Sequence, residues 1–201
     1  HRLVDHLIEA HAYQRIAFIC GPQHHADAED RRQAYGDALA AHGVSLDPAL
    51  VVPGDFSPHS GREAVRVLWD ERARHVDAII AVTDVVALGA VQALQARGVR
   101  VPQDVAVVGF DDVDDALASV PPLTTVRQPF YEQGRKAMEM ILALLAGEEI
   151  PPRVSLSIEL VIRQSCGCFG AAVVQAPAQP PQPPQAQSLE GGSAAQRESA
   201  L

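Results

Sequence analysis

The chain repeatedly alternates short apolar runs with longer stretches of helical periodicity, and this alternation most constrains its fold. The apolar runs are typical of buried strands, and the stretches between them read as amphipathic helices. Strands are expected at residues 16–20, 50–53, 77–82 and 105–110. Helices are expected at residues 2–12, 27–42, 58–74 and 84–97, with Gly43 and Gly98 ending two of them. Because each return crossover is a helix, the pattern predicts an α/β fold with a parallel sheet flanked by helices.

The last third of the chain departs from this alternation. An extended segment at 123–127 and a helix at 131–146 precede a strand at 154–162, whose letters V-S-L-S-I-E-L alternate as in a half-buried strand. We expect one ordered unit, residues 1–168. Residues 169–201, rich in Pro, Gln and Ala, are expected to form a disordered tail with polyproline-like stretches.

Two adjacent carboxylates, Asp111 and Asp112, follow the predicted strand at 105–110. Ligands of parallel α/β sheets sit beyond the carboxyl ends of the strands, where carboxylates can accept hydrogen bonds from hydroxyl or amine groups. Two other interpretations stay open. The pair could start a loop or cap a helix, and it could hold Mg²⁺ if further oxygen ligands converged on it.

Other candidates lie where further strands are expected to end. Arg31 is early in the helix that follows Gly21-Pro22, Phe56 stands in the segment GDFS, and Thr83 precedes Asp84. Each also has a structural interpretation: Arg31 as a surface charge, Phe56 as a core residue, and Asp84 as the cap of the next helix.

Composition and motifs narrow the classes of function. A formal net charge of −9 and a pI of about 5.3 disfavour direct binding to nucleic acid. No apolar run approaches the roughly 20 residues of a membrane span, so we expect no membrane partner. A Gly-rich phosphate loop, a G-x-S-x-G elbow and an H-E-x-x-H motif are all absent from the sequence. We therefore expect neither an enzyme nor a bound cofactor.

The three cysteines suggest no disulfide framework. Cys20 ends an apolar strand and is expected to be a buried thiol. Cys166 and Cys168 form C-x-C, which differs from the C-x2-C spacing of zinc knuckles. We expect a reduced pair without a metal, in a reducing cytoplasm.

Several blocks of sequence together resemble the effector-binding domain of LacI/GalR-type transcriptional regulators. These blocks are IAFICGP, RRQAYGDALAAHG, DAIIAVTDVVALGAVQALQARGVRVPQDVAVVGFDD and PPLTTVRQP. The resemblance covers about residues 1–165. It implies the type I periplasmic-binding-protein fold, in which two α/β lobes enclose a ligand cleft. The chain corresponds mainly to the second lobe, and residues 131–162 match the helix and strand that cross back to the first.

The resemblance also implies roles for single residues. The pattern R-x-x-[GA]-Y places a ligand-binding arginine at Arg31, and G-[FY]-D-D places a ligand-binding acid at Asp111. Phe56 would stack on the ligand, and Thr83 stands where many members carry Asn. The implied partners are a small effector (sugar, polyol or nucleoside-like) and a second copy in a homodimer. DNA would be bound only through an N-terminal helix-turn-helix head outside this sequence.

Two other functions remain open at this point. The ending ELVIRQSCGC resembles versions of the domain that precede cyclase or kinase modules, which would make the chain a sensor of a signalling protein. A solute-binding protein of a transporter is a third interpretation. A helix-turn-helix upstream of His1 would indicate a regulator, whereas a signal peptide there would indicate transport.

Overall fold

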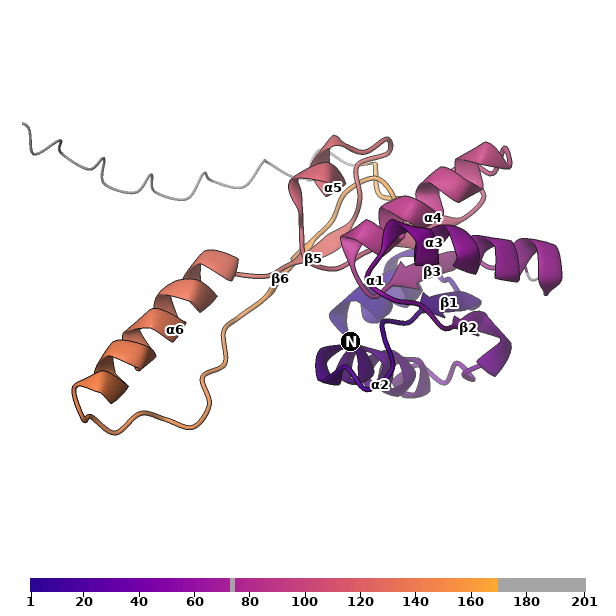
Figure 1. The fold of residues 1–201 in the computed structure, drawn as a ribbon. Helices are drawn as coiled ribbons and strands as arrows, with labels where there is room; N and C mark the ends of the chain where they lie inside the picture. Colours follow the sequence, from indigo (N-terminus) through magenta and orange to yellow (C-terminus); the bar gives the residue numbers. More distant parts are fainter. Residues whose placement is uncertain (73–74, 170–201) are drawn as a thin grey trace, which may run out of the picture.

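The sheet that organises the molecule is four-stranded and parallel, with the order β2-β1-β3-β4. The computed structural model describes residues 1–72 and 75–169 (Figure 1). The strands are β1 (Ile16–Ile19), β2 (Val51–Val52), β3 (Ala78–Ala81) and β4 (Ala106–Val108). Phe18, on β1, is in register with Val51 on one side and Ile80 on the other. The predicted parallel α/β fold is therefore confirmed.

Helices cover both faces of this sheet (Figure 1). The helices α1 (Arg2–His11) and α2 (Ala26–Ala41) pack on one face, and α3 (Pro58–Arg66) and α4 (Asp84–Ala96) pack on the other. Side chains alternate along β1, so that Ile16 and Phe18 join the core under α1 and α2, whereas Ala17 and Ile19 join the core under α3 and α4. Both faces are buried, which explains why the strands are apolar at every position.

The helices α3 and α4 approach each other closely enough to require glycine at the contact. A Cβ atom on Gly61 would lie 2.0 Å from the carbonyl oxygen of Val86, and one on Gly89 would lie 2.1 Å from that of Pro58. The helix α3 continues as one π-helical turn, Val67–Glu71. The last two residues of the helix expected at 58–74 lie outside the described residues.

Two elements of the last third differ from the prediction. The acidic loop after β4 contains a short helix, α5 (Asp114–Ala118), held by the burial of Ala116. The strand expected at 154–162 is reduced to β6 (Glu159–Val161), which pairs antiparallel with β5 (Thr125–Arg127). β5 is only three residues long, so among the described residues the first part of 154–162 has no neighbouring strand. Phe169 is described and exposed, and the rest of the predicted tail lies outside the described residues.

The helix α6 (Phe130–Leu145) extends away from the rest of the molecule (Figure 1). It has no buried residue, and its exposed apolar side chains are Phe130, Tyr131, Met138, Ile141, Leu142, Leu144 and Leu145. The chain then returns through an extended stretch to β6. None of the described helices combines the length and apolarity needed to cross a membrane.

Candidate functional site

A cavity of about 300 Å³ lies beyond the carboxyl ends of the parallel strands. Its lining residues are His25, Asp27, Arg31, Phe56, Thr83, Val85 and Asp111. All four residues singled out in the sequence, Arg31, Phe56, Thr83 and Asp111, therefore meet at one place although they are up to 80 positions apart.

The sheet topology brings these residues together. Arg31 lies in α2, which follows β1, and Phe56 lies in the loop after β2. Thr83 and Asp111 come shortly after the ends of β3 and β4. All four strands are parallel, so their carboxyl ends lie along the same edge of the sheet. The segment that follows each strand therefore contributes at least one side chain to the cavity.

The guanidinium of Arg31 is held in a fixed orientation. Its Nη1 donates a hydrogen bond of 2.6 Å to the carbonyl oxygen of Val82, and its Cζ lies 3.9 Å from the centroid of the Phe110 ring. Burial lowers the pKa of Arg31, while Asp111, then Asp27 and Asp84, act in the opposite direction. An arginine does not deprotonate in proteins. The cavity therefore carries a positively charged planar donor that is already positioned.

Asp111 presents a carboxylate to the same cavity. The backbone at Asp111 has a φ of 124°, and its N–H donates to the carbonyl oxygen of Val126 at 2.8 Å. Gln128 Nε2 donates to Asp111 Oδ1 at 2.6 Å. Burial raises the pKa of Asp111, whereas the Gln128 hydrogen bond and the charge of Arg31 lower it. The result is a carboxylate held at one oxygen by an amide, close to a cation.

Asp112 has a different role from its neighbour. Its side chain is only 3 % exposed, and it accepts hydrogen bonds from Arg127 Nε at 2.6 Å and Arg163 Nη2 at 2.5 Å. Arg163 is itself buried and also donates from Nη1 to the carbonyl oxygen of Leu123. Asp112 therefore fixes the segment around β5 against the chain after β6, and of the acidic pair only Asp111 lines the cavity.

The prediction that Asp84 caps its helix is wrong. Thr83 is the N-cap of α4, and its Oγ1 accepts a hydrogen bond from the Val86 N–H at 3.4 Å. Asp84 is the first helical residue and is fully buried. It accepts hydrogen bonds from Thr125 Oγ1 at 2.5 Å and from the Val113 N–H at 3.0 Å. Burial raises its pKa to about 6. Asp84 thus joins α4 to the segments that carry Asp111.

Phe56 forms the apolar side of the cavity. Phe56 is 36 % exposed, and its ring meets the His25 ring edge to face, with 4.9 Å between the centroids. Gly21 allows this position, because a Cβ atom there would lie 3.0 Å from Phe56 Cε1 and 2.7 Å from the Ala28 Cβ. A half-exposed aromatic ring can cover an apolar face of a ligand.

Sequence reasoning missed five residues at or behind the cavity. They are His25, Asp27, Val85, Phe110 and Gln128. The first two start α2, and the expectation that Arg31 reaches the cavity could have drawn attention to that turn. Phe110 and Gln128 act only through Arg31 and Asp111, and neither carries a local signal. Among the described residues, no three metal-binding side chains converge at this cavity.

A larger cavity of about 780 Å³ lies near the Gly21-Pro22 loop, lined mainly by that loop, the exposed side of α2 and the segment before α3. It includes Arg32 and Glu29 but neither Thr83 nor Asp111. Arg32 and Glu29 form an exposed ion pair. Such a pair contributes little to the free energy of folding. The smaller cavity is the stronger candidate, because polar side chains that follow three strands, β1, β3 and β4, converge there beside the Phe56 ring.

The chain was compared with known proteins. Residues 4–166 match the family described as "Periplasmic binding protein-like domain". The HTH-type transcriptional regulator CelR of Thermobifida fusca is 43% identical over 160 residues, which is 79% of this chain and 46% of CelR. The regulator AscG of Escherichia coli is 38% identical over 162 residues, 81% of this chain and 48% of AscG. The chain thus spans about half the length of the curated relatives it matches.

The similar solved structures are also structures of transcriptional regulators. The CelR–cellobiose complex has a TM-score of 0.76 at 42% identity, covering 81% of this chain and 49% of that one. A lac repressor dimer bound to operator and an anti-inducer has a TM-score of 0.75 at 31% identity, covering 81% of this chain and 58% of that one. The similarity lies in the part of these proteins that has the parallel α/β fold described above.

Proposed function

Because this chain belongs to the periplasmic binding protein-like family of LacI-type regulators, we propose that it senses a small-molecule effector for a transcriptional regulator. The observation that carries the proposal is the convergence of Arg31, Phe56, Thr83 and Asp111 on one cavity. Its relatives are regulators and not enzymes. We infer that the domain binds its ligand without chemical change.

The chemistry of the cavity favours a sugar or a related polyol. A hydroxyl group both donates and accepts hydrogen bonds, and vicinal hydroxyls can therefore bridge the guanidinium of Arg31 and the carboxylate of Asp111. The Thr83 hydroxyl already accepts from the Val86 N–H and remains able to donate. Phe56 would cover one face of the ring. Two of the similar structures are described as a sugar-binding regulator and as a complex with cellobiose, which supports this class of ligand.

The cavity is open to solvent, and we infer that a second lobe covers it. The helix α6 supports this inference, because it exposes an apolar face that nothing in the described part of the chain buries. In this arrangement α6 and the extended stretch before β6 pack on the other lobe. Residues 127–129 and 158–160 form the connections, and the ligand bridges the two lobes.

Ligand binding would then shift the population between an open and a closed arrangement. Arg31 and Asp111 belong to the described lobe, so the differential contact that drives closure has to come from the other lobe. We infer that the regulator is a homodimer, as the similar lac repressor structure is described as a dimer. We also infer that DNA binding resides in a helix-turn-helix head, because the relatives are HTH-type proteins and this chain is acidic.

The test uses the full-length protein. A thermal-shift screen of sugars, polyols and nucleosides should find a stabilising ligand, since a ligand that binds only the folded state raises the melting temperature. That ligand should then change the affinity for an operator fragment in fluorescence anisotropy. The acidic chain of 201 residues alone should not bind that fragment specifically. A protein that binds no compound of these classes, or a ligand without effect on the operator, would argue against the proposal.

A further inference from the structure

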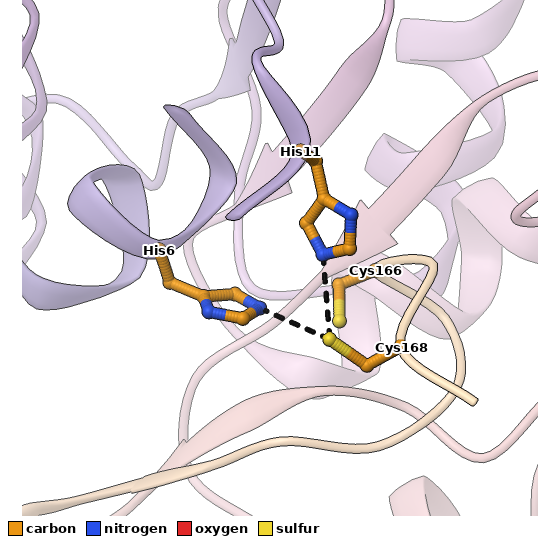
Figure 2. A group of neighbouring side chains, drawn as sticks. All are labelled: His6, His11, Cys166 and Cys168. Atoms are coloured by element: carbon orange, nitrogen blue, oxygen red, sulfur yellow. Dashed lines mark hydrogen bonds between the residues drawn. The ribbon is translucent and has the colours of Figure 1, made fainter. Parts of the chain in front are cut away.

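Two histidines and two cysteines meet on the side of the molecule where the N-terminal helix contacts the chain after β6. His6 and His11 come from α1, and Cys166 and Cys168 come from the turn that follows β6 (Figure 2). One ligand atom from each residue lies within 4.8 Å of all the others. None of the four residues lines the candidate effector cavity. The group is therefore a separate feature of the structure.

The spacing of these atoms fits a tetrahedral metal ion. Cys168 Sγ lies 3.4 Å from His11 Nε2 and 3.7 Å from His6 Nε2 (Figure 2). In a tetrahedral zinc site, bond lengths of about 2.3 Å to sulfur and about 2.05 Å to nitrogen place these two kinds of ligand atom about 3.6 Å apart. The two distances lie on either side of that value. The other pairs of ligand atoms lie within 4.8 Å of each other, and binding an ion would draw them closer together.

The backbone of the turn that carries the cysteines places both of them next to the end of α1. Gly167 has a φ of +108°, a conformation that side chains rarely adopt, and a Cβ atom there would lie 3.2 Å from His11 Cε1. Tyr13 donates a hydrogen bond of 3.1 Å to the carbonyl oxygen of Cys166 and stacks on the His11 ring. These contacts bring the turn against the end of α1 independently of any ion.

We propose that His6, His11, Cys166 and Cys168 bind one Zn²⁺ ion in a closed structural site. Two thiolates and two imidazoles are a ligand set that favours zinc over the hard cations Mg²⁺ and Ca²⁺. Four protein ligands complete the tetrahedron, so no position remains for a substrate or a reactive water. Cys166 is fully buried and the other three ligands are partly buried, as suits a structural ion.

The protonation of the ligands is compatible with this proposal. Burial lowers the pKa of both His6 and His11, and His11 lowers that of His6 further, which favours the neutral imidazole that binds metal. Burial raises the pKa of Cys168 to about 11, so the ion has to displace a thiol proton, as zinc does in other thiolate sites.

The ion would join two ends of the domain. About 155 residues separate the two histidines from the two cysteines, so a single ion would close a loop that contains the whole sheet. Metal binding that exists only in the folded state stabilises that state. Zinc would thereby hold α1 against the turn that follows β6. It would also stabilise the β6 segment, which connects to the proposed second lobe. The C-x-C spacing alone does not indicate a metal site in the sequence, because the other two ligands are histidines near the N-terminus of the chain.

The experiment measures metal in the full chain, purified under reducing conditions without a polyhistidine tag. The protein is stripped with chelator, refilled with Zn²⁺, desalted and analysed by inductively coupled plasma mass spectrometry. The variants are Cys168→Ser and His6→Gln, and the matched controls are Cys20→Ser and His59→Gln, which lie outside the cluster. Circular dichroism reports whether each variant is folded, and Co²⁺ replaces Zn²⁺ for absorption spectra.

We expect one zinc ion per chain in the wild type and both controls, and its loss in both ligand variants. The Co²⁺ form should show tetrahedral visible bands and a thiolate charge-transfer band that Cys168→Ser weakens. His6→Gln alters a partly buried helix side chain and should stay folded even if Cys168→Ser does not. The proposal is overturned if the refilled wild type holds no zinc, if folded His6→Gln holds as much as His59→Gln, or if Cys166 and Cys168 form a disulfide.

Discussion

The guanidinium of Arg31 lies over the ring of Phe110, 3.9 Å from its centroid, and Phe110 is the residue before Asp111. One strand end thus orients the cation of the cavity and also carries its carboxylate. A change at Phe110 therefore affects both charged groups. This relationship connects the fold to the proposed recognition of a polar ligand.

Phe110→Leu should weaken ligand binding while keeping an apolar side chain at the position. The loss of the contact between the ring and the cation corresponds to about 0.5–2 kcal/mol, or roughly a twofold to thirtyfold increase in Kd. Isothermal titration calorimetry on the full-length protein measures this change. Phe169→Leu, at an exposed site away from the cavity, is the matched control. Equal affinity in both variants would contradict the orienting role of Phe110.

The adjacent acids should separate into one residue for binding and one for stability. Asp112→Asn leaves the buried Arg163 without a charged partner and should lower the free energy of unfolding by about 3 kcal/mol or more. Asp111→Asn should have a much smaller effect on unfolding. Both positions have positive φ, and Asn keeps the size and shape of Asp at each. Urea unfolding followed by circular dichroism compares the two. Similar losses of stability would show that the distinction is wrong.

Asp84 should make stability depend on pH. Its pKa in the folded state is raised to about 6 from the ordinary 3.8, so the folded state binds the proton more tightly. The contribution is fully present below pH 4 and is lost as the pH rises toward 6, by roughly 2–3 kcal/mol. The free energy of unfolding of the wild type, measured relative to Asp84→Asn, should fall over this interval. A constant difference between the two proteins would contradict the raised pKa.

The exposed face of α6 should cause self-association of the 201-residue chain when it is studied alone. Leu142→Glu places a charge on this face and should shift the chain toward the monomer in size-exclusion chromatography with light scattering. Gln133→Glu adds the same charge near the start of the helix and should have a smaller effect. A monomeric wild-type chain with slow hydrogen exchange throughout residues 130–162 would mean that α6 is already packed.

The repeating part of the fold could be predicted from the sequence, because short strands that are apolar on both faces alternate with longer helical stretches. The short length of β6 could not be predicted in this way. Its extent depends on pairing with β5 and not on the alternation of apolar and polar residues in its sequence. The start of α4 was misassigned because both Thr83 and Asp84 are good caps. Only the fold shows that the Asp84 carboxylate accepts hydrogen bonds from the Thr125 hydroxyl and the Val113 N–H.

The candidate site was predictable to a similar degree. Arg31 and Asp111 were singled out because one lies early in the helix after β1 and the other follows β4, and because their patterns resemble those of a known family. The separate role of Asp112 was not visible, since its partner Arg163 lies 51 positions away. Gln128, which holds Asp111, belongs to the same class of distant partners.

Calorimetry of Arg31→Ala and Asp111→Asn in the full-length protein, with the ligand identified by the thermal-shift screen, tests the central claim most directly. Each substitution should remove about 1.5–3 kcal/mol of binding free energy, roughly a tenfold to hundredfold increase in Kd, with little change in melting temperature. Arg32→Ala, which removes the neighbouring exposed arginine, should bind like the wild type. If both site variants bind the ligand as tightly as the wild type does, the cavity formed by Arg31, Phe56, Thr83 and Asp111 is not the effector site.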